Sequence, residues 1–201
     1  MLITISGIDG SGKSTLANKL EHSLICKGYK VKQIEFPCSK VWTNLQLLQE
    51  KGDHYEVYGN CSQSVGLALN LERLSFIKEV VCPNVDIYQI VILQRYLLDF
   101  ASIGYAQDAG ENELLMINDM EKVINTNSIS FFLDTDQEVA FQRIQERGAS
   151  LDIRETESFH KKLYDSYHNV FSKGLFPCVR INGNLSSNEV VRDVLERINF
   201  L

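Results

Sequence analysis

The sequence is short of several features that would mark particular classes of protein. No apolar run is long enough to cross a membrane, and the first residues lack the basic segment and small-residue cleavage site of a secretory signal. Five cysteines are scattered over the 201 residues without a Cys-x-x-Cys pair. A disulfide framework or a metal cluster is therefore not expected, and we predict a cytoplasmic protein with reduced thiols.

Basic charge and proline are also scarce. Lysine and arginine total 20 against 26 aspartates and glutamates, which gives a net charge of −6. A nucleic-acid-binding protein normally carries a basic face, so we expect no nucleic-acid partner, whereas a small phosphorylated ligand needs only a few local cations. The three prolines form no linker. The length suits one domain, and residues 1–201 are interpreted as a single domain.

Short apolar runs alternate along the chain with longer segments of helical period. The runs predict strands at residues 2–6, 30–36, 88–93, 129–133 and 178–181. The periodic segments predict helices at residues 14–27, 65–81, 137–147, 155–172 and 187–198. Strands that alternate with helices favour an α/β fold, in which helices cover both faces of a parallel sheet.

The strongest motif follows the first predicted strand. Residues 7–14 read Gly-Ile-Asp-Gly-Ser-Gly-Lys-Ser and fit G-x-x-x-x-G-K-S/T. Glycines allow several backbone N–H groups to converge on a phosphate, and the following helix adds its positive N-terminal end. The lysine of such a loop reaches the β- and γ-phosphates of ATP, and the Ser14 hydroxyl is offered to Mg²⁺. The predicted ATP-binding residues here are Gly7, Gly10, Ser11, Gly12, Lys13, Ser14 and Thr15.

The segment from Ser6 to Thr15 resembles the opening of the thymidylate kinases. Phe36-Pro37 is similar to the family's F-P-x-R turn after the second strand, and Arg73 lies in a segment similar to its base-binding helix. The resemblance continues in the second half of the chain.

Gln94-Arg95-Tyr96 stands where the family has D-R-Y. The segment 132–136, followed by Arg143, Arg147 and residues 152–155, resembles the family's strand, helix and lid. The resemblance therefore covers most of the chain, and the lid stretch and the Arg95-Tyr96 pair are its more specific parts.

The resemblance implies a P-loop kinase fold with a lid at about residues 147–156. It implies ATP-dependent transfer of the γ-phosphate, with Mg²⁺, to a deoxynucleoside monophosphate such as dTMP. It also implies a homodimer formed through helices beside the base-binding helix.

Roles on the acceptor side follow from the same resemblance. Asp9 is expected to bond the sugar 3′-hydroxyl, Arg95 to hold the acceptor phosphate, and Arg73 to bond the base. A guanidinium fork matches two phosphate oxygens. Tyr105 either packs against the deoxyribose or is a core tyrosine. The substrate-binding set implied is Asp9, Phe36, Leu69, Arg73, Arg95 and Tyr105.

On the donor side, the resemblance implies that Arg143 stacks on the adenine. Arg147 and Arg154 would neutralise charge on the transferring phosphoryl group. The phosphate loop has Gly10-Ser11 where one subclass carries an arginine, so the chain resembles the subclass that takes its arginine from the lid. The implied catalytic set is Lys13, Arg95, Arg147 and Arg154. The turn at residues 182–184 either adjoins the adenine or is a plain surface turn.

Three residues depart from the family pattern. Gln94 replaces an aspartate that helps to hold Mg²⁺ and its waters, so slower catalysis is expected. Ser39 replaces the arginine of F-P-x-R, and the neighbouring Lys40 has a point charge without the fork. Leu69 replaces the aromatic residue that stacks on the base, so thymine need not be the base that is recognised.

Two other functions remain open on the sequence. A deoxynucleoside kinase on the same fold would need a carboxylate base, for which Glu35 or Glu56 are candidates. The segment Glu35 to Pro37, with Trp42 and Gln63, faintly resembles such enzymes. A nucleotide-binding paralogue with little turnover is the second alternative, and Gln94 and Ser39 motivate it.

Overall fold

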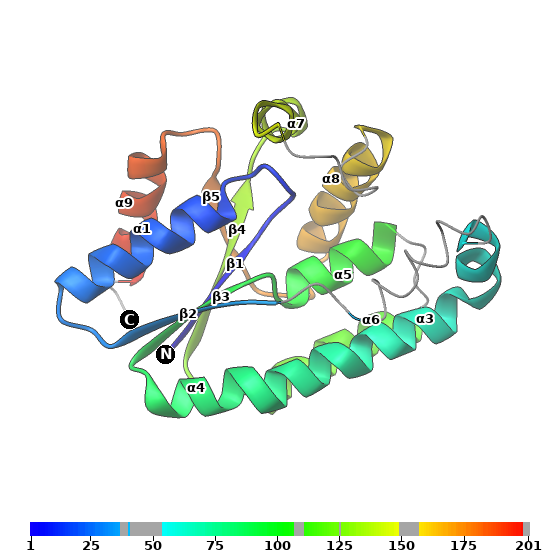
Figure 1. The fold of residues 1–201 in the computed structure, drawn as a ribbon, viewed down its shortest axis with the longest axis horizontal. Helices are drawn as coiled ribbons and strands as arrows, with labels where there is room; N and C mark the ends of the chain where they lie inside the picture. The colour runs from blue at the N-terminus through cyan, green and yellow to red at the C-terminus, as the bar shows by residue number, and fades with distance from the viewer. Residues whose placement is uncertain (37–39, 41–53, 107–110, 125, 149–156, 199–201) are drawn as a thin grey trace.

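A five-stranded parallel sheet forms the centre of the computed structural model (Figure 1). The structure describes residues 1–36, 40, 54–106, 111–124, 126–148 and 157–198. The strand order is β2-β3-β1-β4-β5. The strands are β1 (Leu2–Ser6), β2 (Val31–Glu35), β3 (Ile90–Gln94), β4 (Ser128–Asp134) and β5 (Val179–Asn182). Each predicted strand is confirmed to within two residues, and so is the α/β class.

Helices cover both faces of the sheet, which explains why every residue of β1 and β3 is buried. Ile3 and Ile5 point to the face covered by α1 (Lys13–Cys26) and α9 (Ser187–Ile198). Leu2 belongs to the opposite core, beneath α5 (Leu97–Ala106) and α8 (Glu157–Ser172). Figure 1 shows these two helical layers on either side of the sheet.

The α5 side carries a further helical layer, and here the structure differs from the sequence-based prediction. The helix predicted at residues 65–81 begins earlier, as α3 (His54–Phe76), and passes through a π-helical turn (Ile77–Val81) into α4 (Cys82–Ile87). The wide turn ends two residues before Pro83, which has no N–H to continue the regular ladder. Helices α5 and α6 (Glu111–Met120) were not predicted. Most of α5 is buried and apolar, so it lacks the polar face that reveals a helical period.

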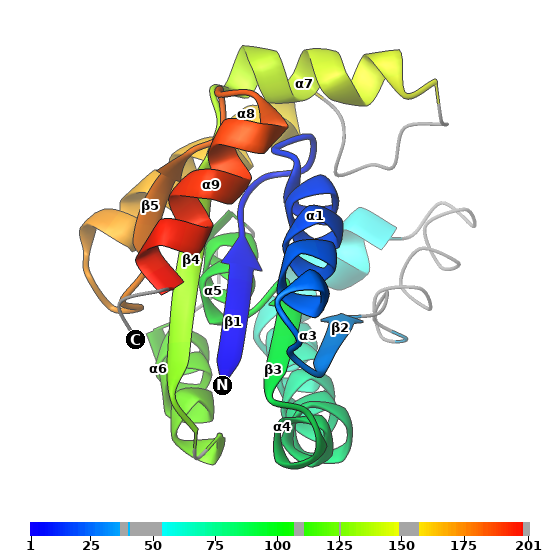
Figure 2. The same ribbon diagram turned by 90° about the vertical axis from the view of Figure 1, so that its left-hand side faces the viewer.

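Helix α7 (Gln137–Glu146) lies across the carboxyl ends of the strands (Figure 2). In α/β sheets this edge is where ligands bind, beside the point where the strand order reverses. Here that point lies between the neighbouring strands β1 and β3, because α1, which follows β1, covers one face of the sheet and α5, which follows β3, covers the other. The predicted lid at residues 147–156 falls outside the described residues from position 149 onward. Among the described residues, no helix combines the length and apolar character needed to span a membrane.

Candidate active site

The phosphate loop connects β1 to α1, and two of its glycines are required by close packing. A Cβ on Gly7 would lie 2.7 Å from the carbonyl oxygen of Leu133, and one on Gly10 would lie 2.0 Å from that of Ala140 in α7. Gly12, at the N-cap of α1, has a left-handed φ of 97°. The loop therefore lies against β4 and α7 at a separation that only glycine allows.

Lys13 is buried within this loop rather than extended from it. Its Nζ donates to the carbonyl oxygens of Gly7 (2.7 Å) and Ile8 (2.8 Å) and lies 3.6 Å from Asp9 Oδ1. Burial and the neighbouring Arg95 lower the pKa of Lys13 to about 8, although Asp9 and Asp99 act in the opposite direction. The loop thus holds a cation at the position where the motif needs one for phosphate.

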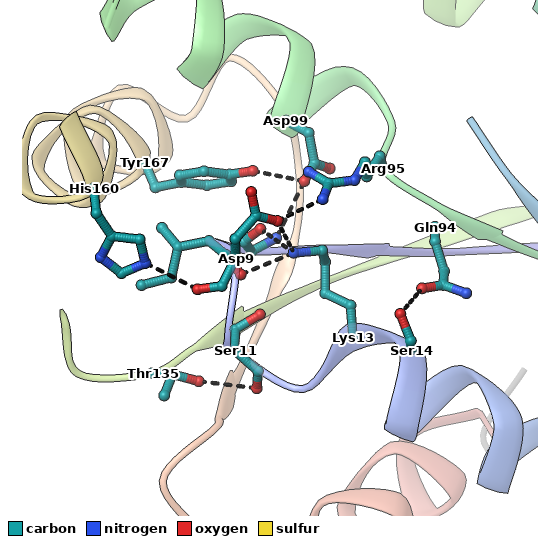
Figure 3. Close-up of polar contacts among 12 residues, drawn as sticks. Asp9, Ser11, Lys13, Ser14, Gln94, Arg95, Asp99, Thr135, His160 and Tyr167 are labelled. Carbon is teal, nitrogen blue, oxygen red and sulfur yellow. Dashed lines mark hydrogen bonds and ion pairs between the residues drawn. The ribbon is translucent and has the colours of Figure 1, made fainter. Parts of the chain in front are cut away.

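Ser14 and Gln94 meet at the end of β3. The Ser14 hydroxyl donates to Gln94 Oε1 over 2.8 Å, and the Gln94 side chain is buried while Ser14 is exposed. The residue that departs from the family's aspartate therefore contacts the predicted metal-binding hydroxyl directly (Figure 3). The contact places a neutral amide oxygen, not a carboxylate, beside that hydroxyl.

Arg95 and Asp9 form an ion pair at the centre of the site. Arg95 Nη2 lies 2.5 Å from Asp9 Oδ1, and the same carboxylate oxygen faces Lys13. Arg95 has a φ of 64°, and it is the one non-glycine residue with a positive φ among the described residues. A left-handed arginine costs backbone energy and is characteristic of functional positions. This geometry aims the guanidinium at the phosphate loop.

Three buried residues that the sequence did not reveal hold this arrangement in place. Asp99 accepts hydrogen bonds from the backbone N–H groups of Gly7 (3.3 Å) and Tyr96 (2.9 Å). The Tyr167 hydroxyl, from α8, donates to Asp99 Oδ1 over 2.6 Å. His160, also from α8, has Nε2 placed 2.9 Å from the Asp9 carbonyl oxygen, so Nε2 is the protonated nitrogen. No local motif pointed to the bonds from Gly7 and Tyr167 to Asp99 or from His160 to Asp9, because each joins residues 68 or more positions apart.

A cavity of about 250 Å³ lies on the other side of the phosphate loop. Arg143 of α7 borders it and donates to the carbonyl oxygens of Ser11 (3.4 Å) and Gly183 (3.3 Å). Thr15 and Leu185 contribute to the lining. The cavity thus joins the start of α1 to Arg143 and to the turn at residues 182–184.

A second group of predicted residues gathers between β2, α3 and α5. Arg73 is buried, lies 4.5 Å above the ring of Phe100 and donates to Asn70 Oδ1 over 2.8 Å. Phe36 meets Phe100 edge-to-face, with 5.1 Å between ring centroids. Leu69 is buried in α3, one turn before Arg73.

The remaining predicted residues are placed differently. Tyr105 is near the end of α5, six residues beyond Asp99. The Lys173 Nζ lies 4.5 Å from the centre of the Tyr105 ring. Arg147 is exposed at the C-cap of α7. Arg154 and Ser39 lie outside the described residues. The structure therefore brings together Asp9, Lys13, Ser14 and Arg95, and it places Arg73 and Phe36 beside one another.

The order of the parallel strands and the glycine loop after the first of them define a P-loop kinase fold. A solved structure of similar fold is the deoxyadenosine kinase from M. mycoides, described with the products dCMP and a flexible dCDP bound. The TM-score is 0.64, the sequence identity is 18%, and each chain is covered completely. At that identity the likeness supports the fold alone.

Sequence comparison identifies the family. Residues 5–194 match the sequence pattern of the family described as "Thymidylate kinase". The thymidylate kinase of Acholeplasma laidlawii is 26% identical, over 98% of each chain. That of Caldicellulosiruptor saccharolyticus is 29% identical, over 98% of this chain and 92% of the relative. The chain belongs to the thymidylate kinase family.

The fit between the phosphate loop and α7 gives a prediction about stability. Gly10→Ala forces a Cβ against the Ala140 carbonyl at a backbone φ of 82°. We expect a loss of about 2–3 kcal/mol and a fall in Tm of about 4–12 °C. Gly28→Ala is the matched control, because Gly28 has a similar φ of 89° and nothing within 4 Å of the place that an added Cβ would take. It should cost only about 1 kcal/mol. Equal melting temperatures for the two variants would contradict the close packing.

Proposed function

We propose that the protein transfers the γ-phosphate of ATP to a deoxynucleoside monophosphate, with Asp9, Lys13 and Arg95 at the point of transfer. Membership of the thymidylate kinase family makes it an ATP-dependent nucleoside monophosphate kinase. The single observation that carries the assignment of residues is the contact of Asp9 with both Lys13 and Arg95. It joins a cation of the phosphate loop to a guanidinium outside the loop.

The donor side of this proposal uses the phosphate loop and the cavity beside it. The N–H groups of the loop and Lys13 would hold the ATP phosphates. The cavity bordered by Thr15, Arg143 and Leu185 would receive the adenine. Arg143 is held by two backbone carbonyl groups, so its planar guanidinium is oriented before ATP binds.

The oxygens of Ser14 and Gln94 at the end of β3 fit a Mg²⁺ ion that is bound to ATP and arrives with it. Such an ion keeps phosphate and water oxygens as most of its ligands, so few protein groups are needed. Ser14 would supply a hydroxyl, and the amide oxygen of Gln94, 2.8 Å from that hydroxyl, would accept a hydrogen bond from a metal-bound water. When bound, the ion would neutralise charge on the β- and γ-phosphates.

The acceptor side would use Arg95 for the phosphate and Asp9 for the sugar. Arg73, Phe36 and Leu69 would face the base, and their grouping between β2 and α3 supports this assignment. The contact of Tyr105 with the deoxyribose stays a prediction. The roles of Arg147 and Arg154 in neutralising charge on the transferring phosphoryl group also stay predictions.

Transfer on such a site needs positioning more than acid–base chemistry. The attacking oxygen belongs to a phosphate that is already anionic near neutral pH, so no base has to remove a proton from it. The cations Lys13 and Arg95 lie where they would draw the two phosphates together despite their charge. This property makes the chemistry tolerant of Gln94.

The test is a coupled assay of ADP formation with Mg²⁺ and ATP against a panel of nucleosides and nucleoside monophosphates. Turnover with a monophosphate, and none with Lys13→Ala at equal folded concentration, supports the proposal and names the base. Turnover with free nucleosides alone would assign a nucleoside kinase, for which Glu35 is exposed at the end of β2. ATP binding without any turnover would assign a nucleotide-binding paralogue.

Replacing Arg95 should separate acceptor from donor. We expect Arg95→Ala to raise the acceptor KM about 10-fold or more, because the forked phosphate contact is lost, and to change the ATP KM by no more than about threefold. Arg95→Lys keeps the charge without the fork and should be intermediate. Equal rises in both KM values would remove Arg95 from the acceptor side.

Restoring a carboxylate at position 94 should strengthen the metal site. We expect Gln94→Asp to lower the Mg²⁺ concentration for half-maximal rate about 3- to 10-fold, because an anionic oxygen favours the hard cation. Mg²⁺ titration of the enzyme with a non-transferable ATP analogue gives the same comparison by binding. Gln94→Asn is the matched control for side-chain length. If Gln94→Asp and Gln94→Asn change the Mg²⁺ requirement equally, the negative charge at position 94 is not what strengthens the metal site.

A homodimer and a cytoplasmic location belong to the same proposal, with no role for nucleic acid. Cys26, Cys82 and Cys178 are free thiols, as a reducing compartment favours. Leu67 and Leu71 on α3 are 50% and 54% exposed, and Leu115 on the adjoining α6 is 56% exposed. These three leucines would be covered by a second copy of the chain.

Light scattering during size-exclusion chromatography tests this assembly. We expect a dimer for the wild type and a monomer for Leu71→Glu, because the charge would be buried in the interface. Ile25→Glu is the matched control, since Ile25 is 51% exposed on α1, on the other side of the sheet. A dimer that survives Leu71→Glu, or a monomeric wild type, would exclude this interface.

A further inference from the structure

The Asp99 carboxylate is buried, charged and without a part in the chemistry proposed above. Its solvent exposure is 0%, and three donors surround it. Oδ1 accepts from Gly7 N–H and from the Tyr167 hydroxyl, and Oδ2 accepts from Tyr96 N–H. Burying a carboxylate costs free energy unless hydrogen-bond donors are supplied, and these three donors stabilise the buried Asp99 carboxylate.

The three donors come from three separate segments. Gly7 opens the phosphate loop, Tyr96 follows Arg95 at the end of β3, and Tyr167 is in the middle of α8. Figure 3 shows Asp99 and Tyr167 on the far side of the Asp9–Arg95 pair from Ser14. One carboxylate thus connects the donor-binding loop with the arginine assigned to the acceptor.

The bond from Tyr96 N–H has a second effect. Asp99 is the third residue of α5 and reaches back to the N–H that precedes the helix, as the acidic residue of a capping box does. The peptide it holds directly follows Arg95, whose φ of 64° is strained. The start of α5 and the direction of the Arg95 side chain are therefore set together.

We propose that Asp99 is a positioning residue that sets the separation between the phosphate loop and Arg95, and that Tyr167 orients its carboxylate for this task. The inference rests on the proposed function, in which Arg95 holds the acceptor phosphate. Each substrate binds through its own segment, so the separation matters chiefly when the two phosphates must align. A misplacement of about 1 Å in such a geometry costs a transfer rate about 100-fold.

The test measures transfer separately from binding. Rapid-quench single turnovers, with enzyme in excess and both substrates saturating, report the transfer step. Calorimetric titrations with ATP alone and with the monophosphate alone report the two dissociation constants and the fraction of competent sites. The variants are Asp99→Ala, Asp99→Asn and Tyr167→Phe.

Two of these variants are mild by design. Tyr167→Phe removes one hydroxyl and keeps the ring, which stacks on Phe132 at an interplanar angle of 3°. Asp99→Asn keeps an oxygen for Gly7 and Tyr167 and loses the acceptor for Tyr96 N–H. Ser102→Ala is the matched control, because Ser102 is equally buried on α5 and its hydroxyl has no hydrogen-bond partner in the described part of the chain.

We expect Asp99→Ala to slow transfer about 30- to 100-fold and Tyr167→Phe about 3- to 10-fold, with Asp99→Asn between them. Both dissociation constants should stay within about threefold of the wild type, and Ser102→Ala should match the wild type. If Asp99→Ala does not fold, Asp99→Asn and Tyr167→Phe decide the question.

Unchanged transfer in those two variants would overturn the inference, and so would a loss of transfer matched by an equal weakening of either substrate's binding. A wild-type chain that transfers no phosphate to any monophosphate would overturn the proposed function and this inference together. Wild-type transfer with normal transfer in the variants would overturn this inference alone.

Discussion

Four charged groups are packed together at the carboxyl edge of the sheet, and the rest of the site depends on their mutual neutralisation. Lys13 and Arg95 are the cations, and Asp9 and Asp99 are the carboxylates. Lys13 and Asp99 are buried, whereas the Arg95 and Asp9 side chains are 25% and 16% exposed, and the loss of any one charge would leave its neighbours with less compensation. The fold tolerates two cations side by side because Asp9 contacts both and Asp99 lies behind them.

This cluster also explains why helices distant in sequence meet at the phosphate loop. Helix α8 supplies Tyr167 to Asp99 and His160 to the Asp9 carbonyl, while α7 lies directly on Gly10. The phosphate loop is consequently held by Asp99 of α5 and by contacts with α7 and α8. A backbone held in this way needs little rearrangement to present its N–H groups to phosphate, which is what an efficient phosphate-binding loop requires.

Sequence patterns predicted part of this site well and part of it not at all. The motif from Gly7 to Ser14 was recognisable because its residues are contiguous and each type has a local reason to be there. The departure at Gln94 was also visible, and the structure adds that its amide oxygen contacts the Ser14 hydroxyl. Asp99 and Tyr167 carried no such signal, because an aspartate in an apolar helix and a tyrosine in an amphipathic one have many ordinary explanations. Helix α5 itself was missed because burial on nearly every side hides the 3.6-residue period.

The sequence by itself determined the phosphate loop, the strands and most of the helices, since these depend on the order of neighbouring residues. Only the tertiary structure decided which charges meet. Asp9 pairs with a residue 86 positions away, Asp99 with a hydroxyl 68 positions away, and the Asp9 carbonyl with His160 at a separation of 151. Buried polar groups must find partners wherever the fold provides them, and the strand order β2-β3-β1-β4-β5 brings those partners to one edge. That requirement acts through space and leaves no periodic trace along the chain.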